Sequence, residues 1–273
     1  MQNIQESINA IRAQKPLILN LTNFVTMDFI ANCLLAIGAA PIMCASEDEL
    51  EELIQMSAVI YINIGTVNLN FIKLAEKAIT LAKKHKKPVV LDPVGCGATK
   101  IRTRTASELA SHCQIIRGNA SEIMALGSSS FLTKGVESVH QTEATTETAD
   151  NIAKDMGSTI VISGATDYIT DSINTKKISF GHPIMTSITG MGCCLTAVIA
   201  AVLAITKNPF EAGIIGSQYF SLCGEIVSQS HTKPGSFKAA FIDMLYSPDF
   251  DAIRKSHDQK NQYITCNDSP RLI

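Results

Sequence analysis

The sequence predicts an α/β fold with three layers, in which a mostly parallel sheet carries helices on both faces. Short runs of β-branched residues alternate with longer stretches of helical periodicity, the pattern of parallel strands joined by crossover helices. Apolar residues make up 46% of the 273 residues, enough to bury a sizeable core. This length suits one large domain and is marginal for two, so we expect a single domain over 1–273.

The expected strands and helices follow one another along the chain. Strands are expected at 17–20, 59–64, 89–92, 115–117 and 159–163, with two shorter ones at 168–170 and 177–180. Helices are expected at 24–36, 69–84, 103–112, 121–126 and 146–156, and then at 193–206, 209–229 and 236–246. Residues 127–148, rich in Ser, Thr and Gly, predict a surface loop, and the polar tail from about Ser247 shows no periodicity.

Composition argues against several classes of partner. The formal charge is −2, from 23 Lys and Arg against 25 Asp and Glu, and no basic stripe indicates nucleic acid. The longest apolar run, 193–205, is shorter than the ~20 residues that span a bilayer, so it predicts a buried helix and no membrane partner. The first residues lack the pattern of a signal peptide, and the eight cysteines form no C-x-x-C pair. We therefore expect a cytoplasmic protein.

The turn Thr189–Cys194, with the sequence TGMGCC, leads into that buried helix. Gly190 and Gly192 allow the backbone to approach a ligand closely, and the first N–H groups of a helix have no acceptor within it. Together with the helix dipole they predict an anion cradle suited to a phosphoryl group. The alternative is a tight loop before a close-packed helix, which we disfavour because polar residues at other strand ends converge on the same edge.

Asp92 ends an apolar strand and is followed by Pro93 and two glycines. A carboxylate at this position could hold Mg²⁺, usually through water, while a turn-forming Asp-Pro is an equally good interpretation. Farther along, Arg117 follows a strand and could reach a nucleotide phosphate. Glu122 could share the metal with Asp92, but Asn119 and Glu122 have the spacing of a helix capping box, which is the better interpretation of that segment alone.

Asn23 and Met43 are candidates for the substrate side. Asn23 could cap the helix that follows it, or present its amide to a ring nitrogen or hydroxyl of a substrate. Met43 is a core residue by default, although a flexible thioether also suits a heteroaromatic ring.

Six segments, in this order, resemble the hydroxyethylthiazole kinase family, whose fold is ribokinase-like. They are LTNFVT with Ala31–Asn32, GAAPIM at Gly38–Met43, INIGT at Ile62–Thr66, LDPVGCGAT at Leu91–Thr99, RGNASEI at Arg117–Ile123 and TGMGCCLTA at Thr189–Ala197. Any one of them is modest support, and six in order are strong support.

The resemblance implies an ATP- and Mg²⁺-dependent kinase that phosphorylates the hydroxyl of 4-methyl-5-(2-hydroxyethyl)thiazole, in thiamine biosynthesis or salvage. It also implies a homotrimer with active sites between subunits. Carried over by position, the resemblance implies that Met43, Gly190 and Asn23 contact the substrate and that Arg117 and Ser163 contact ATP. It implies metal contacts for Asp92 and Glu122. It also implies that Cys193 holds the catalytic position, in an anion hole formed by Gly190, Met191, Gly192 and Cys193. Ser163 stands where the family often has Thr, which keeps the hydroxyl and loses a methyl group.

Cys193 raises a mechanistic question, because related sugar kinases are similar but have Asp there as the catalytic base. A helix N-terminus lowers the pKa of a thiol, whereas a bound triphosphate raises it, so we expect a weak base whose loss is partly tolerated. Three rival functions remain: a cysteine hydrolase with His182 or His231 as base, a same-fold dehydratase of a hydrated nicotinamide cofactor, and a non-catalytic nucleotide-binding module. A kinase for another small heteroaromatic alcohol also remains open.

Overall fold

The computed structural model describes residues 1–129 and 141–267, whose strands form one eight-stranded sheet in the order β2-β1-β3-β4-β5-β6-β7-β8. The strands are β1 (Leu17–Leu21), β2 (Ala40–Met43), β3 (Val59–Asn63), β4 (Val89–Asp92), β5 (Ile115–Asn119), β6 (Thr159–Ser163), β7 (Asp167–Thr170) and β8 (Thr175–Ile178). Neighbours from β2 to β6 are parallel, whereas β7 and β8 are antiparallel additions. The mostly parallel sheet is thus confirmed.

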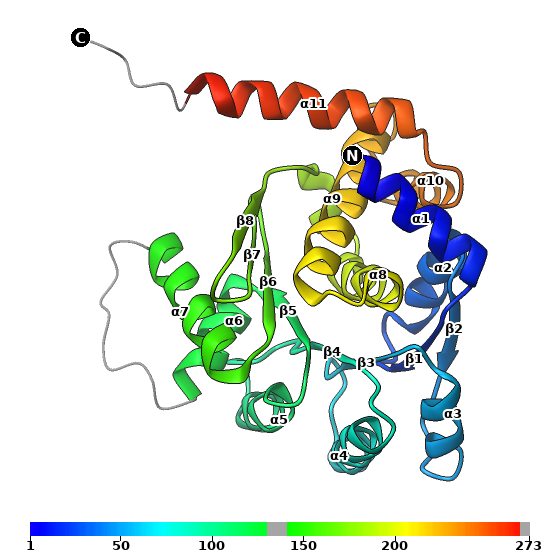
Figure 1. Ribbon diagram of the computed structural model, residues 1–273, viewed down its shortest axis with the longest axis vertical. Coiled ribbons are helices and arrows are strands. Elements are labelled where there is room, and N and C mark those ends of the chain that lie inside the picture. The colour runs from blue at the N-terminus through cyan, green and yellow to red at the C-terminus, as the bar shows by residue number, and fades with distance from the viewer. Residues whose placement is uncertain (130–140, 268–273) are drawn as a thin grey trace.

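Helices cover both faces of this sheet, as Figure 1 shows. One face carries α1 (Gln2–Gln14), α2 (Met27–Ile37), α8 (Met191–Thr206), α9 (Pro209–Ser228) and α10 (Pro234–Tyr246), with α11 (Phe250–Asn267) packed on α9. The other carries α3 (Leu50–Met56), α4 (Leu69–Lys84), α5 (Lys100–Ala110), α6 (Ala120–Ser129) and α7 (Gln141–Met156). A short 3₁₀-helix, η1 (Pro183–Ser187), precedes α8.

Strand side chains alternate between two apolar cores, one on each face. Tyr61 and Val90 belong to the core beneath α8, whereas Ile60 belongs to the core on the α4 face. Because this alternation has a period of two, Asn63 and Asp92, which end their strands, fall on the α8 face. The carboxyl edge of the sheet therefore presents polar side chains to the start of α8.

Helix α8 is buried on all sides, which explains its continuous apolar sequence. It has 16 residues, and no helix within the described part of the chain is long and apolar enough to cross a membrane. Its N-cap is Gly190, with a φ of 93°, a left-handed conformation that glycine adopts without steric cost. The sharp turn into α8 thus depends on this residue.

Several expectations from the sequence need correction. Strand β2 was not expected, because Pro41 weakens a strand pattern, and neither was α3, which is only 7 residues long. Helix α1 was also missed. The loop expected over 127–148 is helical at both ends, in α6 and α7, while 130–140 lies outside the described residues.

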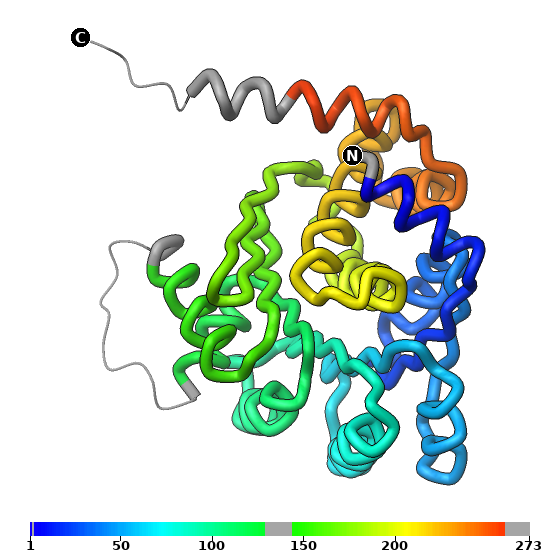
Figure 2. Tube along the Cα trace, viewed as in Figure 1, coloured from blue at the N-terminus to red at the C-terminus, as the bar shows by residue number. Residues whose placement is uncertain are grey.

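The tail from about Ser247 is not irregular, since it contains α11. The sequence of this helix is mostly polar, which is why it shows little periodicity. Ile253 is fully buried, Ser256 donates to Glu225 Oε1 at 2.7 Å, and the His257 ring lies 5.7 Å from the ring of Phe180. Helix α1 and the first turns of α11 lie on the same side of the sheet (Figure 2), where the Arg12 side chain of α1 donates to the carbonyl oxygens that end α10.

Each edge of the sheet has a feature that disfavours further pairing. Edge strand β2 contains Pro41, which has no backbone N–H, and edge strand β8 exposes Lys176 and Lys177.

Candidate active site

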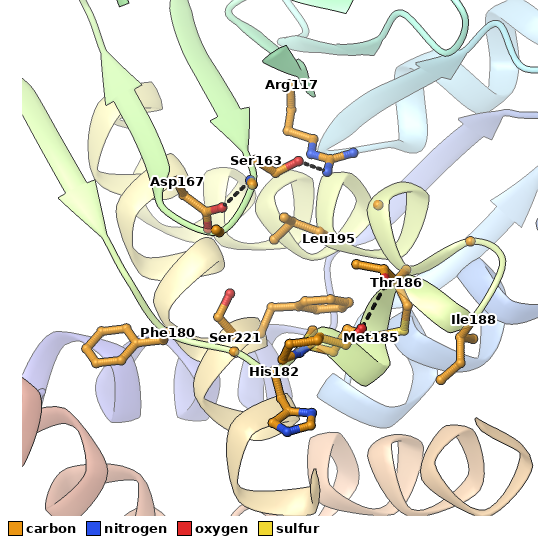
Figure 3. A pocket seen from close by; sticks show the side chains of 18 residues that line it. Arg117, Ser163, Asp167, Phe180, His182, Met185, Thr186, Ile188, Leu195 and Ser221 are labelled. Carbon is orange, nitrogen blue, oxygen red and sulfur yellow. Dashed lines mark hydrogen bonds between the residues drawn. The ribbon is translucent and has the colours of Figure 1, made fainter. Parts of the chain in front are cut away.

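A cavity of about 660 Å³ lies at the carboxyl edge of the sheet, next to the start of α8. Figure 3 shows Arg117, Ser163 and Asp167 on one side of it, and His182, Met185 and Thr186 on another. Its lining combines the ends of β5 and β6 with η1 and α9, and includes the turn residues Gly190, Met191 and Gly192. The volume and the mixed lining are those of a small-molecule site.

The glycine-rich turn faces this cavity as the sequence predicted. Cys194 N–H donates to the Gly190 carbonyl at 2.8 Å, which leaves the earlier N–H groups of α8 without an acceptor inside the helix. Gly192 is required for a separate reason, because a Cβ there would lie 2.6 Å from Arg117 Nη1. The guanidinium therefore packs directly against the backbone of the turn.

Arg117 is buried between two other residues expected in the site. Its Nη2 donates to the Ser163 hydroxyl, and its Nη1 lies 3.9 Å from Asp92 Oδ2. The Asp92 side chain is almost fully buried, and burial raises its pKa to about 6, against the opposing effect of Arg117 and with a further increase from Glu122. The structure thus brings Arg117, Ser163, Asp92 and the turn together.

Glu122 forms the capping box that its spacing indicated. Asn119 Oδ1 accepts from Glu122 N–H at 2.9 Å, and Glu122 Oε2 accepts from Asn119 N–H at 2.9 Å. The other oxygen, Oε1, accepts from Gly95 N–H at 2.8 Å, which ties the loop after β4 to α6. Each carboxylate oxygen keeps a further lone pair, so capping does not by itself exclude a metal contact.

A site for Mg²⁺ can be tested on this donor set. Asp92 Oδ1 is buried and has no hydrogen-bond partner, which is unusual for a carboxylate oxygen and is consistent with a ligand that completes its coordination. Across 1–129 and 141–267, no three His, Cys, Asp or Glu side chains lie close enough to form a metal cluster. Mg²⁺ commonly takes one or two carboxylates together with water and substrate phosphates, so Asp92 and Glu122 fit it.

Asn23 lies in a buried hydrogen-bond network under the turn. Its Nδ2 donates to Asn63 Oδ1 at 2.9 Å and lies 3.6 Å from Cys193 Sγ, while its Oδ1 accepts from Thr26 N–H at 3.0 Å. Asn23 therefore does not cap α2, whose N-cap is Thr26 without a side-chain cap, and instead closes the turn before that helix. A substrate contact through the Asn23 amide stays a prediction, and so does one through Met43, which lies on edge strand β2 outside the cavity lining.

The expected lowering of the Cys193 pKa is wrong. The side chain is 9% exposed, and burial raises the pKa of the thiol, with a further increase from Asp92. The candidate bases of a cysteine hydrolase have other partners: His182 Nδ1 accepts from Ile184 N–H at 3.2 Å, and His231 Nδ1 lies 2.9 Å from the Ser230 hydroxyl. These observations disfavour a thiolate nucleophile.

Four polar residues of this region were not singled out from the sequence. Tyr61, Asn63 and Thr196 are fully buried, and Asp167 is buried beside Arg117 in the cavity wall. A signal existed for the first three, because each interrupts an otherwise apolar strand or helix with a group that needs a hydrogen-bond partner. Asp167 carried no such signal, since its strand is short and lies beyond a turn.

The sequence profile of the hydroxyethylthiazole kinase family matches residues 8–249. The chain belongs to this family. A hydroxyethylthiazole kinase from Chlamydia caviae is 46% identical over 261 residues, which cover 95% of this chain and 100% of that protein. One from Leptospira biflexa is 40% identical over 262 residues, covering 95% of this chain and 98% of that protein.

Solved structures agree with this membership. The structure of a hydroxyethylthiazole kinase protein from Pyrococcus horikoshii has a TM-score of 0.87 at 36% identity, and covers 93% of this chain and 96% of that one. A ribokinase-like superfamily protein from Enterococcus faecalis has a TM-score of 0.62 at 16% identity, with 84% and 86% covered, which supports the fold alone. The ribokinase-like fold expected from the sequence is thereby confirmed, and the chain is a member of a kinase family.

Proposed function

We propose that this protein transfers the γ-phosphoryl group of ATP to the hydroxyl of 4-methyl-5-(2-hydroxyethyl)thiazole, as one domain over 1–273 that serves thiamine biosynthesis or salvage. Family membership supports the reaction. The observation that carries it is the glycine-rich start of α8, which faces a cavity containing Arg117 and Ser163. Free N–H groups and a buried guanidinium are the donors that a transferring phosphoryl group needs.

In this proposal Arg117 and Ser163 hold the phosphates of ATP. Arg117 is fixed in place by its hydrogen bond to Ser163 and by packing against Gly192, so it would not reorganise when charge develops on the phosphoryl oxygens. The backbone from Gly190 to Cys193 would form the anion hole. Gly190 would also contact the thiazole, on the side of the turn that faces Thr26.

Asp92 and Glu122 would hold Mg²⁺. The unpartnered Oδ1 of Asp92 supports this role, and Glu122 is placed at the loop that follows β4. When bound, the ion neutralises charge on the phosphates. The two residues themselves would orient the metal-bound phosphates of the nucleotide.

Cys193 would lie at the catalytic position as a weak base. Its raised pKa means that the thiol is mostly protonated near neutral pH, so it can contribute little by removing a proton from the substrate hydroxyl. Most of the rate enhancement would then come from positioning and charge stabilisation.

The substrate side would be completed by a second subunit of a cytoplasmic homotrimer. Met43 lies outside the nucleotide cavity, and next to Asn23 the side chains of Phe24 and Val25 are 68% and 70% exposed. Exposed large apolar side chains beside a binding residue favour an interface between copies of the chain. Met43 and Asn23 would then meet the thiazole at that interface.

The test is to incubate the purified protein with ATP, Mg²⁺ and the thiazole alcohol, and to follow the phosphorylated thiazole by mass spectrometry. We expect product that requires ATP and disappears on adding EDTA. If the folded protein gives no product with this alcohol but phosphorylates another small heteroaromatic alcohol, the proposed substrate is wrong and the proposed reaction class, a kinase, still holds. If the protein instead dehydrates a hydrated nicotinamide cofactor, the dehydratase is the correct function and the kinase proposal is wrong.

A further inference from the structure

The two oxygens of the Asp92 carboxylate have different surroundings. Oδ2 accepts from the Thr196 hydroxyl at 2.9 Å, from the Tyr61 hydroxyl at 3.2 Å and from Asn63 Nδ2 at 3.2 Å. Arg117 Nη1 lies 3.9 Å from the same oxygen. Oδ1 has no such partner, although it is buried. One oxygen is therefore anchored and the other is left for a ligand.

The Tyr61 hydroxyl connects that anchored oxygen to the anion cradle. It accepts from Asn63 Nδ2 at 2.8 Å and lies 3.2 Å from Asp92 Oδ2 and 3.1 Å from the carbonyl oxygen of Cys193. A phenol has a single proton, so the two acceptors compete for it. A side chain from β3 thus bridges the end of β4 and the first turn of α8.

Thr196 makes a second connection between the same parts. It lies on α8 one turn after Gly192, whose carbonyl is 3.2 Å from the Thr196 hydroxyl. The hydroxyl also donates to Asp92 Oδ2. The carboxylate is therefore joined to α8 directly through Thr196 and indirectly through Tyr61.

We propose that Tyr61 and Thr196 are positioning residues, which fix Asp92 to the first turn of α8 so that its free oxygen and the anion cradle keep one relative position. The inference rests on the proposed function, in which Asp92 holds the metal and the cradle holds the phosphoryl group. A carboxylate that would hold a metal and a cradle that would hold the phosphoryl group must keep a fixed separation, and the hydrogen-bond partners of a metal ligand set its orientation.

The hydroxyls can be removed with little change of shape, by Tyr61→Phe and Thr196→Val. We expect each to weaken Mn²⁺ binding by about tenfold, as loss of a partner of a metal ligand typically does. The measurement is electron paramagnetic resonance of Mn²⁺ in the presence of a non-hydrolysable ATP analogue. In turnover assays we expect kcat to fall while KM for the thiazole alcohol stays within about twofold, because the substrate side is untouched.

Tyr219→Phe is the matched control. Tyr219 is also fully buried, and its hydroxyl donates to the Leu245 carbonyl at 2.9 Å, away from the site. It should lower the melting temperature as Tyr61→Phe does, without changing Mn²⁺ affinity. If Tyr61→Phe does not fold, the test is the comparison of Thr196→Val with Thr196→Ser. Serine keeps the hydroxyl, so Thr196→Ser should bind Mn²⁺ with nearly the affinity of the wild-type protein.

Equal Mn²⁺ affinity in Tyr61→Phe, Thr196→Val and the control would overturn the proposal, whatever happened to stability. The same holds if Thr196→Ser behaves like Thr196→Val. Failure of the proposed function looks different: the wild-type protein would form no phosphorylated thiazole, while the loss of Mn²⁺ affinity in the two variants would still support the inference.

Discussion

Cys193 is buried in the first turn of α8, and burial raises the pKa of its thiol, so the thiol stays mostly protonated near neutral pH. We expect Cys193→Ala to lower kcat by less than about a hundredfold, the lower end of what loss of a general base costs, and to leave KM for ATP nearly unchanged. Steady-state kinetics on the purified variant check this. Cys223→Ala, at a fully buried cysteine of α9, is the control for stability alone. Complete loss of turnover with intact ATP binding would show that Cys193 is an essential base.

Asp167 gives the protein a pH-dependent stability. Burial raises its pKa to about 6 from an ordinary value of 3.8, against the effects of the Gly164 N–H and of Arg117. The folded carboxyl thus holds its proton more tightly than the unfolded one, so its contribution to stability is fully present below pH 3.8 and is lost as the pH rises through about 6.

The Asp167→Asn variant lacks this titration. We therefore expect the difference in the free energy of unfolding between Asp167→Asn and wild type to be more favourable to the variant at pH 8 than at pH 4, by up to about 3 kcal/mol. Urea unfolding at several pH values measures it. Asp251→Asn changes a largely exposed side chain and should leave the pH slope unaltered. Identical slopes for wild type and Asp167→Asn would contradict the prediction.

Much of the site could be predicted residue by residue, because strand ends mark it in the sequence. Asp92, Arg117 and Ser163 each follow an apolar run, and the parallel sheet brings them to one edge. Tyr61 could not be assigned in this way. A hydroxyl inside an apolar strand indicates that it needs a hydrogen-bond partner, but which partner it finds depends on the distance between the end of β4 and the first turn of α8, which is set by packing across the sheet.

The start of α8 is the element on which the proposed ATP site depends. Gly192→Ala would push a methyl group against Arg117 Nη1, so we expect KM for ATP to rise at least about tenfold, since small displacements of a binding group are costly. Steady-state kinetics and a thermal melt separate binding from folding. Gly235→Ala is the control, because a Cβ there meets nothing within 4 Å. An unchanged KM would show that Arg117 does not hold ATP.

Helix α6 begins with a capping box that also reaches the loop after β4. Asn119→Ala removes the acceptor for Glu122 N–H and should lower the free energy of unfolding by about 1 kcal/mol, whereas Asn119→Asp should restore most of it. Urea denaturation checks both variants. No loss in Asn119→Ala would mean that Glu122 holds its position without the cap.

Elements with a strong apolar pattern were predictable whatever their length, whereas elements without one were missed, including the 13-residue α1 and the 18-residue α11. The buried helix α8 and the strands β3 and β6 carry strong apolar patterns. Strand β2 is interrupted by proline, and α11 has a single fully buried apolar contact within its first turns, Ile253, so neither produces a periodic signal. Both obtain their stability from tertiary contacts, which local patterns do not record.

For the whole molecule, α11 supports the far wall of the cavity that we propose to bind ATP. It braces Glu225, whose Oε2 accepts from Gly181 N–H at 3.1 Å, and Gly181 lines the cavity. We expect Ile253→Ala to cost about 2–4 kcal/mol of stability and to raise KM for ATP more than KM for the alcohol. Lys255→Ala, on the exposed side of the same helix, should do neither. Equal effects of the two substitutions would refute this support role.

The two rims of the sheet also limit how copies of the protein can associate. Pro41 at one rim and the lysine pair Lys176 and Lys177 at the other oppose the templated addition of a further strand. Continuous sheets running through several subunits are therefore disfavoured, and so is polymerisation of folded molecules into fibres. An assembly such as the one proposed next to Met43 and Asn23 must therefore rest on side-chain contacts and not on the pairing of backbone strands.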